Sequence, residues 1–226
     1  MSGSFLPDRA HGWIPGERLA RREPVLPAPE GAPRVGVLAL QGDVLEHLRA
    51  LRRCGADAVA VRSVGALTDV DGLIVPGGES TTIGKLLVRL ELMDALRSRV
   101  ADGLPVFGTC AGMILLSDQL DQDVAQPLIG GLHVRTRRNA FGRQLDSFDT
   151  RIEVAGIDGG PMDVAFIRAP RVEQILADDV EVLAVVEGHP VVVRQGPLLA
   201  AAFHPEVTGD DRLHAAFVAT VVHARG

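Results

Sequence analysis

The spacing of hydrophobic residues changes several times in the first half of the chain, and each change predicts an element. Residues 34–40 form an uninterrupted apolar run, which is typical of a strand buried on both faces of a parallel sheet. In residues 43–54, apolar side chains recur on one helical face, and Gly55 follows as a stop signal. Similar patterns predict strands at 58–62, 72–76 and 105–108 and helices at 80–100 and 111–120. Strands that alternate with helices in this way indicate βα units and a parallel sheet.

The second half of the chain is richer in strand patterns. Six runs predict strands and one amphipathic stretch predicts a last helix, with strands at 132–137, 149–155, 163–169, 181–187, 190–195 and 198–204 and the helix at 210–224. We expect a three-layer α/β domain with a mostly parallel central sheet, flanked by helices, and some antiparallel later strands.

Residues 1–33 follow neither period, are rich in proline and contain the single tryptophan. They are predicted to be a flexible extension to a domain of residues 34–226, with a structured cap or a partner-binding arm as the alternative.

The composition of the 226-residue chain excludes several classes of protein. Hydrophobic residues make up 46% and charged residues 23%, which suffices for a sizeable core. The net charge of −6 argues against a dedicated nucleic-acid-binding protein. No apolar run approaches the roughly 18 residues of a membrane helix, and the N-terminus lacks the apolar core of a secretory signal, so we expect a cytoplasmic protein. Cys54 and Cys110 could pair, but two reduced thiols fit that compartment better.

Cys110 lies in the sequence Gly-Thr-Cys-Ala-Gly, between a predicted strand and a predicted helix. This is the arrangement of a nucleophile elbow, in which small neighbours allow a sharp turn that lifts the side chain out of the sheet. Amides at the start of the helix favour a thiolate and face the oxyanion that its attack creates. The alternative is a small core residue, because cysteine is among the most buried residue types. Cys54, in the last turn of a predicted helix, is interpreted as structural.

A nucleophilic cysteine needs a base and a group that orients the base. His204 is the candidate because it ends an apolar strand and is followed by Pro205 and Glu206. Pro205 biases His204 away from helical geometry, and side chains two residues apart in an extended backbone point the same way, so Glu206 can orient the ring. An ordinary strand-end turn is the alternative. His47 and His214 fall within predicted helices and are interpreted as packed or solvated.

Two further stretches could bind a substrate. Residues 76–81, PGGEST, follow a predicted strand, and their glycine amides could complete an oxyanion hole. Glu79 is then a candidate for recognising a substrate ammonium, whereas an ordinary strand-to-helix turn is the alternative. Residues 135–144 contain four arginines, which could grip a carboxylate, contribute to a protein interface or form a solvated loop.

These motifs together resemble the glutaminase subunit family of pyridoxal 5′-phosphate synthase (the PdxT/SNO family), a branch of the class I triad glutamine amidotransferases with a flavodoxin-like fold. The resemblance spans about residues 34–223 and is carried by six motifs in their family order: LALQGDVLEH, GLIVPGGESTTI, PVFGTCAGMILL, RNAFGRQLDSF, FIRAP and AFHPEV. The N-terminal extension lies outside it.

The resemblance implies a function and a set of site residues. The activity is hydrolysis of L-glutamine to glutamate and ammonia through a γ-glutamyl thioester, with ammonia delivered to a synthase subunit that makes pyridoxal 5′-phosphate. The triad is Cys110 as nucleophile, His204 as base and acid, and Glu206 as third member. The glutamine site comprises Gly78, Glu79, Ser80, Arg143, Ile167 and Arg168, and the oxyanion and activation positions are Gly78, Ala111 and Gln41. No cofactor, metal, nucleic acid or membrane is implied.

The resemblance also implies an enzyme whose activity is low until its synthase partner docks and orders the oxyanion hole. A glutaminase serving another synthase and an inactive regulatory module of the same fold are the competing interpretations. The intact Cys110, His204 and Glu206 argue against the inactive module.

Overall fold

The computed structural model describes residues 28–121, 125–138 and 147–226, and within them a seven-stranded sheet forms the centre of the molecule. The strand order is β10-β11-β12-β4-β3-β1-β2, where the strands are β1 (Arg34–Leu38), β2 (Asp57–Val61), β3 (Gly72–Val75), β4 (Val106–Thr109), β10 (Glu181–Val186), β11 (His189–Gln195) and β12 (Leu198–Ala201). The five strands from β12 to β2 are parallel, whereas β10, β11 and β12 pair antiparallel. The predicted mixed α/β sheet is confirmed.

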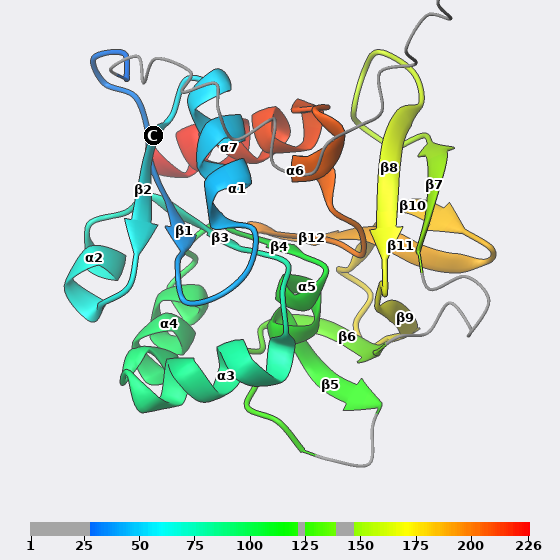
Figure 1. Cartoon of the computed structure of the whole chain (residues 1–226), viewed down its shortest axis with the longest axis horizontal. Coiled ribbons are helices and arrows are strands. Elements are labelled where there is room, and N and C mark those ends of the chain that lie inside the picture. The colour runs from blue at the N-terminus through cyan, green and yellow to red at the C-terminus, as the bar shows by residue number, and fades with distance from the viewer. Residues whose placement is uncertain (1–27, 122–124, 139–146) are drawn as a thin grey trace, which may run out of the picture.

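Helices cover both faces of this sheet (Figure 1). On one face lie α1 (Val44–Arg53) and α7 (Arg212–Arg225), and on the other lie α3 (Ser80–Arg89), α4 (Leu92–Ala101) and α5 (Ala111–Leu116). Every residue of β3, β4 and β12 is buried, because strands covered on both faces have no solvent side. The expected three-layer arrangement is therefore present.

Several smaller elements complete the described chain. Two short helices are α2 (Val64–Thr68) and α6 (Pro205–Thr208). A three-stranded sheet contains β5 (Ser117–Asp121), β6 (Leu132–Arg137) and β9 (Arg171–Ile175), and a two-stranded sheet contains β7 (Ser147–Ile152) and β8 (Met162–Ile167). Of these elements, the sequence patterns predicted only β6, β7 and β8. The first 27 residues of the predicted extension lie outside the described residues.

The single long helix predicted at 80–100 is wrong, because the chain breaks into α3 and α4. Glu91 adopts the left-handed conformation with φ of 57°, and its N–H bonds the carbonyl of Val88 to close the last turn of α3. The break lets α4 turn so that Leu92, Met93 and Leu96 are buried. Core packing thus overrides a helical period that continues across the break.

The helix predicted at 111–120 is also wrong in its second half. It ends at Leu116, and Ser117 begins the extended strand β5, which pairs with β6. All six residues of α5 are buried, so this segment has no polar face whose period could mark where the helix ends. Ser117 closes the helix by donating its hydroxyl to the carbonyl of Met113 at 2.8 Å.

The strand order places four loops at one edge of the central sheet. The chain passes from β1 to β2 on one side, whereas β3 and β4 lie on the other side of β1. Such a switch in strand order leaves a crevice at the carboxyl ends of the parallel strands, where sites form in open α/β sheets. The segments that leave β1, β3, β4 and β12 carry most of the sequence-predicted site residues, whereas Ile167 and Arg168 lie at the end of β8. Among the described residues, no helix is both long and apolar enough to cross a membrane.

Candidate active site

Cys110 occupies a strained turn between β4 and α5. Its backbone has φ of 47° and ψ of −103°, a conformation that side chains adopt only where the surroundings enforce it. Two glycines allow this turn, because a Cβ on Gly108 would lie 2.6 Å from the Gly112 carbonyl carbon, and one on Gly112 would lie 2.0 Å from the Val75 oxygen. The Cys110 amide donates to the carbonyl of Ala201 at 2.8 Å. The turn is therefore tied to the ends of β3 and β12.

His204 and Glu206 are in direct contact, although not through the backbone geometry that the sequence predicted. His204 Nδ1 lies 2.8 Å from Glu206 Oε1. The strand β12 ends at Ala201, His204 is the N-cap of α6, and Pro205 occupies the first turn of that helix. Proline favours the first turn of a helix, where its missing N–H costs nothing. Glu206 thus reaches the ring from a helical turn and not from an extended strand.

The surroundings of His204 favour its charged form. Burial opposes protonation of the ring, but its interactions with Asp43, Cys110 and Glu206 prevail and raise the pKa of His204 to about 12. Asp43 Oδ2 lies 3.3 Å from Nδ1, so two carboxylates face the same ring nitrogen. Burial also raises the pKa of Glu206, and the contact with His204 opposes this rise. The ring, the thiol and the carboxylates therefore form one coupled group.

The loop after β3 packs directly against this group. A Cβ on Gly77 would lie 2.3 Å from Cε1 of the His204 ring, so only glycine fits there. The Gly77 amide donates to the Thr109 hydroxyl at 3.0 Å. Gly78 has φ of 149°, and a Cβ there would lie 2.6 Å from Oε1 of Gln41, which also accepts the Glu79 amide at 2.7 Å. Gln41 from the β1–α1 loop and Thr109 from β4 therefore fix the two sides of the Gly77–Gly78 peptide.

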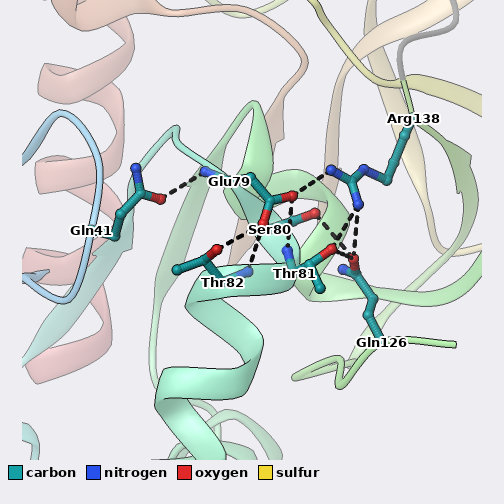
Figure 2. A network of polar contacts seen from close by, with 7 residues as sticks. All are labelled: Gln41, Glu79, Ser80, Thr81, Thr82, Gln126 and Arg138. Carbon is teal, nitrogen blue, oxygen red and sulfur yellow. Dashed lines mark hydrogen bonds and ion pairs between the residues drawn. The ribbon is translucent and has the colours of Figure 1, made fainter. Parts of the chain in front are cut away.

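Glu79 and Arg138 form a polar network beside this loop (Figure 2). Glu79 is the N-cap of α3 and accepts the amides of Thr81 and Thr82, and Arg138 pairs with its carboxylate. Partial burial opposes ionisation, but the hydrogen bonds from Thr82, Arg138 and Thr81 lower the pKa of Glu79 to about 2. Arg138 also donates to the Thr81 hydroxyl at 2.7 Å. The guanidinium is thereby held close to the start of α3.

The other sequence-predicted residues have mixed outcomes. Ser80 is buried and donates to Oε1 of Gln126 at 3.2 Å. Ala111 is the first residue of α5, directly after the nucleophile elbow. The carbonyl of Ile167, at the end of β8, lies 3.9 Å from Sγ of Cys110, and Arg168 beside it has φ of 45°. Arg143 lies outside the described residues.

The structure adds residues to the site that the sequence analysis did not assign. Arg138 was one of four arginines in a cationic stretch, and only the fold shows that it contacts Glu79. Asp43 and Gln126 carried no sequence signal, because loops distant in the sequence bring them in. The donor atoms of Asp43, His204 and Glu206 lie within 4.8 Å of one another and could hold a cation, but the Nδ1 atom that it would need already contacts both carboxylates.

Comparisons with known proteins agree with this architecture. The model of the SNO glutamine amidotransferase family matches residues 37–223. The chain is 62% identical over 191 residues to "Pyridoxal 5′-phosphate synthase subunit PdxT" of Parafrankia sp., a match that covers 84% of this chain and 94% of the relative. It is 62% identical over 190 residues to the protein of that name from Frankia casuarinae, covering 84% and 95%.

A solved structure described as a glutamine amidotransferase is also similar to the chain. It has a TM-score of 0.79 and 49% sequence identity, with 83% of this chain and 98% of that chain covered.

Proposed function

Since the chain belongs to the SNO glutamine amidotransferase family, we propose that Cys110, His204 and Glu206 are the catalytic triad with which it hydrolyses L-glutamine. The chain is the glutaminase subunit of a glutamine-dependent pyridoxal 5′-phosphate synthase. One observation carries the triad assignment. The His204 ring contacts the buried Glu206 at 2.8 Å and also interacts with Cys110, which lies in a strained backbone turn.

The proposed reaction has two halves. The Cys110 thiolate attacks the carboxamide carbon of glutamine, and His204 gives a proton to the departing nitrogen, so that the C–N bond breaks and ammonia leaves. This forms a γ-glutamyl thioester. His204 then takes a proton from water, whose oxygen attacks the thioester carbon, and the C–S bond breaks to release glutamate and the thiolate. The raised pKa of His204 supports this order, because the ring begins the cycle with a proton to give.

The oxyanion of each tetrahedral intermediate needs hydrogen-bond donors close to Cys110. We assign this role to the amides of Gly78 and Ala111, with Gln41 holding the loop through the Glu79 amide. Ala111 follows the nucleophile directly, and Gly77 packs against the catalytic ring. Both amides therefore belong to segments that the triad itself positions.

The glutamine backbone would bind at the start of α3. We propose Gly78, Glu79 and Ser80 as one side of this site and Ile167 and Arg168 as the other, since the carbonyl of Ile167 contacts Cys110. Arg143 stays a prediction. Arg138 is the cation that we add, because it is fixed beside Glu79 and can pair with the substrate carboxylate.

The partner follows from the family assignment and from the chemistry of ammonia. The synthase subunit of pyridoxal 5′-phosphate synthase is the chain's partner. We propose that its docking orders the Gly77–Gly78 peptide and that ammonia passes directly into the complex, since free ammonia would be protonated in bulk water. The cytoplasm is the proposed location, because Cys54 and Cys110 are free thiols and the second must stay reduced to react.

We further propose that residues 34–226 contain the whole glutaminase domain and that residues 1–33 are an extension. The family model begins only at residue 37, which supports this boundary. A chain that lacks residues 1–33 should keep the glutamine turnover of the full chain in the presence of the synthase subunit.

The test of the triad is glutamate release from L-glutamine, measured with and without the synthase subunit. Cys110→Ala should abolish release while binding of the synthase subunit survives, and His204→Ala should lower turnover more than Glu206→Ala does. Full activity in Cys110→Ala, or wild-type rates in both other variants, would remove the assignment. An inactive regulatory module would show no glutamate release in the wild-type complex.

A further inference from the structure

Two fully buried histidines extend from the triad into the core. His47 on α1 and His214 on α7 are each 0% exposed, and His47 Nδ1 lies 2.9 Å from His214 Nε2. The other nitrogen of His47, Nε2, lies 3.1 Å from the Thr109 hydroxyl and 3.5 Å from Oε2 of Glu206. A buried imidazole pair is costly unless its nitrogens are satisfied. Its position between Glu206 and Thr109 therefore requires an explanation.

Oxygen Oε2 of Glu206 is the catalytic-site atom that faces this histidine pair. The carboxylate uses Oε1 for the catalytic ring, and Oε2 is buried with no hydrogen-bond partner of ordinary geometry among the described residues. His47 Nε2 faces it at 3.5 Å. An unsupported oxygen in this position would favour the protonated acid, which cannot stabilise an imidazolium. Support of Oε2 thus bears directly on whether Glu206 can act.

The positions of the protons follow from counting donors and acceptors. Burial lowers the pKa of His47 well below its usual value and that of His214 to about 4, so each ring is neutral and carries one N–H. If His47 donated to His214, the N–H of His214 would be on Nδ1, which has no partner among the described residues. The opposite arrangement leaves only a lone pair unpaired, and lone pairs are left unpaired more readily than N–H groups. His214 therefore donates to His47, and the Nε2–H of His47 points toward Thr109 and Glu206.

The same N–H connects the acid to the oxyanion loop. The Thr109 hydroxyl that faces His47 also accepts the amide of Gly77, whose backbone packs against the His204 ring. The His47 imidazole thus faces two groups of the site. One is the Glu206 carboxylate, and the other is the Thr109 hydroxyl, which holds the Gly77 amide.

We propose that His47, with its proton placed by His214, is a positioning residue that keeps the Glu206 carboxylate ionised and oriented toward His204 while the thioester forms and breaks. The proposal rests on the triad mechanism proposed above. His47 touches neither glutamine nor the reacting atoms, so its loss should slow turnover and leave glutamine binding unchanged.

The decisive comparison uses His47→Gln and His47→Asn in the full chain with its synthase subunit. The two side chains are both polar and nearly equal in size, but the Gln amide nitrogen replaces Nε2 whereas the Asn oxygen replaces Nδ1. We expect kcat for glutamate release to fall about tenfold or more in His47→Asn and about threefold or less in His47→Gln, with KM within about twofold in both. Equal kcat values, a better Asn variant, or a change confined to KM would overturn the proposal.

Loss of stability is controlled with Val221→Ala. Val221 is buried on α7, the helix that carries His214, and packs against Gly72 of β3. Its truncation therefore loosens the packing of α7 on the sheet without altering the histidine pair. This variant should lower Tm and leave kcat unchanged, which separates destabilisation from the positioning effect.

A second measurement keeps the proposal independent of glutamine hydrolysis. The rate at which iodoacetamide alkylates Cys110 needs no substrate and reports how strongly the His204 ring activates this cysteine. This alkylation rate should be lower in His47→Asn than in the wild type, and in His47→Gln it should be close to the wild-type rate. Equal glutamate release by the wild-type complex and by Cys110→Ala would refute the triad assignment. The alkylation rates would still decide whether His47 supports Glu206. Identical alkylation in both His47 variants would refute that support.

Discussion

The two cysteines of the chain should react with iodoacetamide at very different rates. Cys110 interacts with the His204 ring, whose pKa is raised to about 12, so the sulfur lies beside a cation. Cys54 caps α1, where burial and then the nearby Asp211 raise its pKa to about 11. Because the thiolate is the reactive form, alkylation distinguishes the candidate nucleophile from the residue interpreted as structural.

The expected size of the difference starts from the ionised fraction of Cys54. At about pH 7.5, a thiol with a pKa of about 11 is ionised in roughly 3 molecules out of 10,000. Cys110, by contrast, lies beside the charged His204 ring, which is the setting in which reactive cysteines occur. A more basic thiolate is intrinsically more nucleophilic and recovers part of this deficit, so we expect Cys110 to react about a hundredfold faster than Cys54.

The assay is mass spectrometry of the two cysteine peptides after timed alkylation between about pH 6.5 and 8.5. His204 stays protonated over this range, which lies below its pKa of about 12, so the cation beside Cys110 is present throughout the experiment. The Cys54 rate should rise about tenfold for each pH unit. His204→Ala is the matched control, because it removes the cation beside Cys110 and should slow the alkylation of Cys110. Comparable rates at both cysteines in the wild type would refute the activation of Cys110 by His204.

Three further variants test the surroundings of the triad in the glutaminase assay. Asp43→Asn should lower kcat less than about fivefold, because this half-exposed carboxylate contacts Nδ1 of His204 from the solvent side; a loss as large as that of His204→Ala would contradict this. Gly77→Ala should lower kcat about a hundredfold, since its Cβ would lie 2.3 Å from the ring, whereas Gly65→Ala, with no atom within 4 Å, should be silent. Arg138→Ala should raise KM for glutamine about tenfold with kcat nearly unchanged; an unaltered KM would remove Arg138 from the substrate site.

How far the sequence predicts this molecule depends on the range of the interactions that decide each feature. Local patterns sufficed for the parallel strands and for the turn at Cys110, because a short apolar run and flanking glycines are properties of neighbouring residues. They failed at Glu91, where the left-handed residue separates α3 from α4, and at Ser117, where α5 gives way to β5. In both places the decision comes from packing against distant segments, which no local period records.

The same distinction between local patterns and distant contacts applies to the candidate site. The contact of His204 with Glu206 was predicted, but the extended backbone used to argue for it was wrong, because Pro205 starts a helix there. Asp43 shares Nδ1 of His204 across a separation in sequence that no motif spacing could reveal. The two buried histidines could not be distinguished from packed residues, because only the assembled sheet brings His47 to Glu206.

The arrangement also indicates which part of the site a partner can control. The triad is enclosed, since Glu206 and the ring are buried and the acid contacts an imidazole on each side. A partner that docks at the surface therefore has little effect on the geometry of these buried groups. The Gly77–Gly78 peptide differs, because Gly78 has a backbone conformation that favours glycine. Within the described part of the chain, the side chains that bond the amides on either side of this peptide are those of Gln41 and Thr109. Thr109 is buried, whereas Gln41 lies in the exposed loop before α1. We therefore infer that a partner which moves Gln41 resets the oxyanion amides while leaving the nucleophile ready to attack.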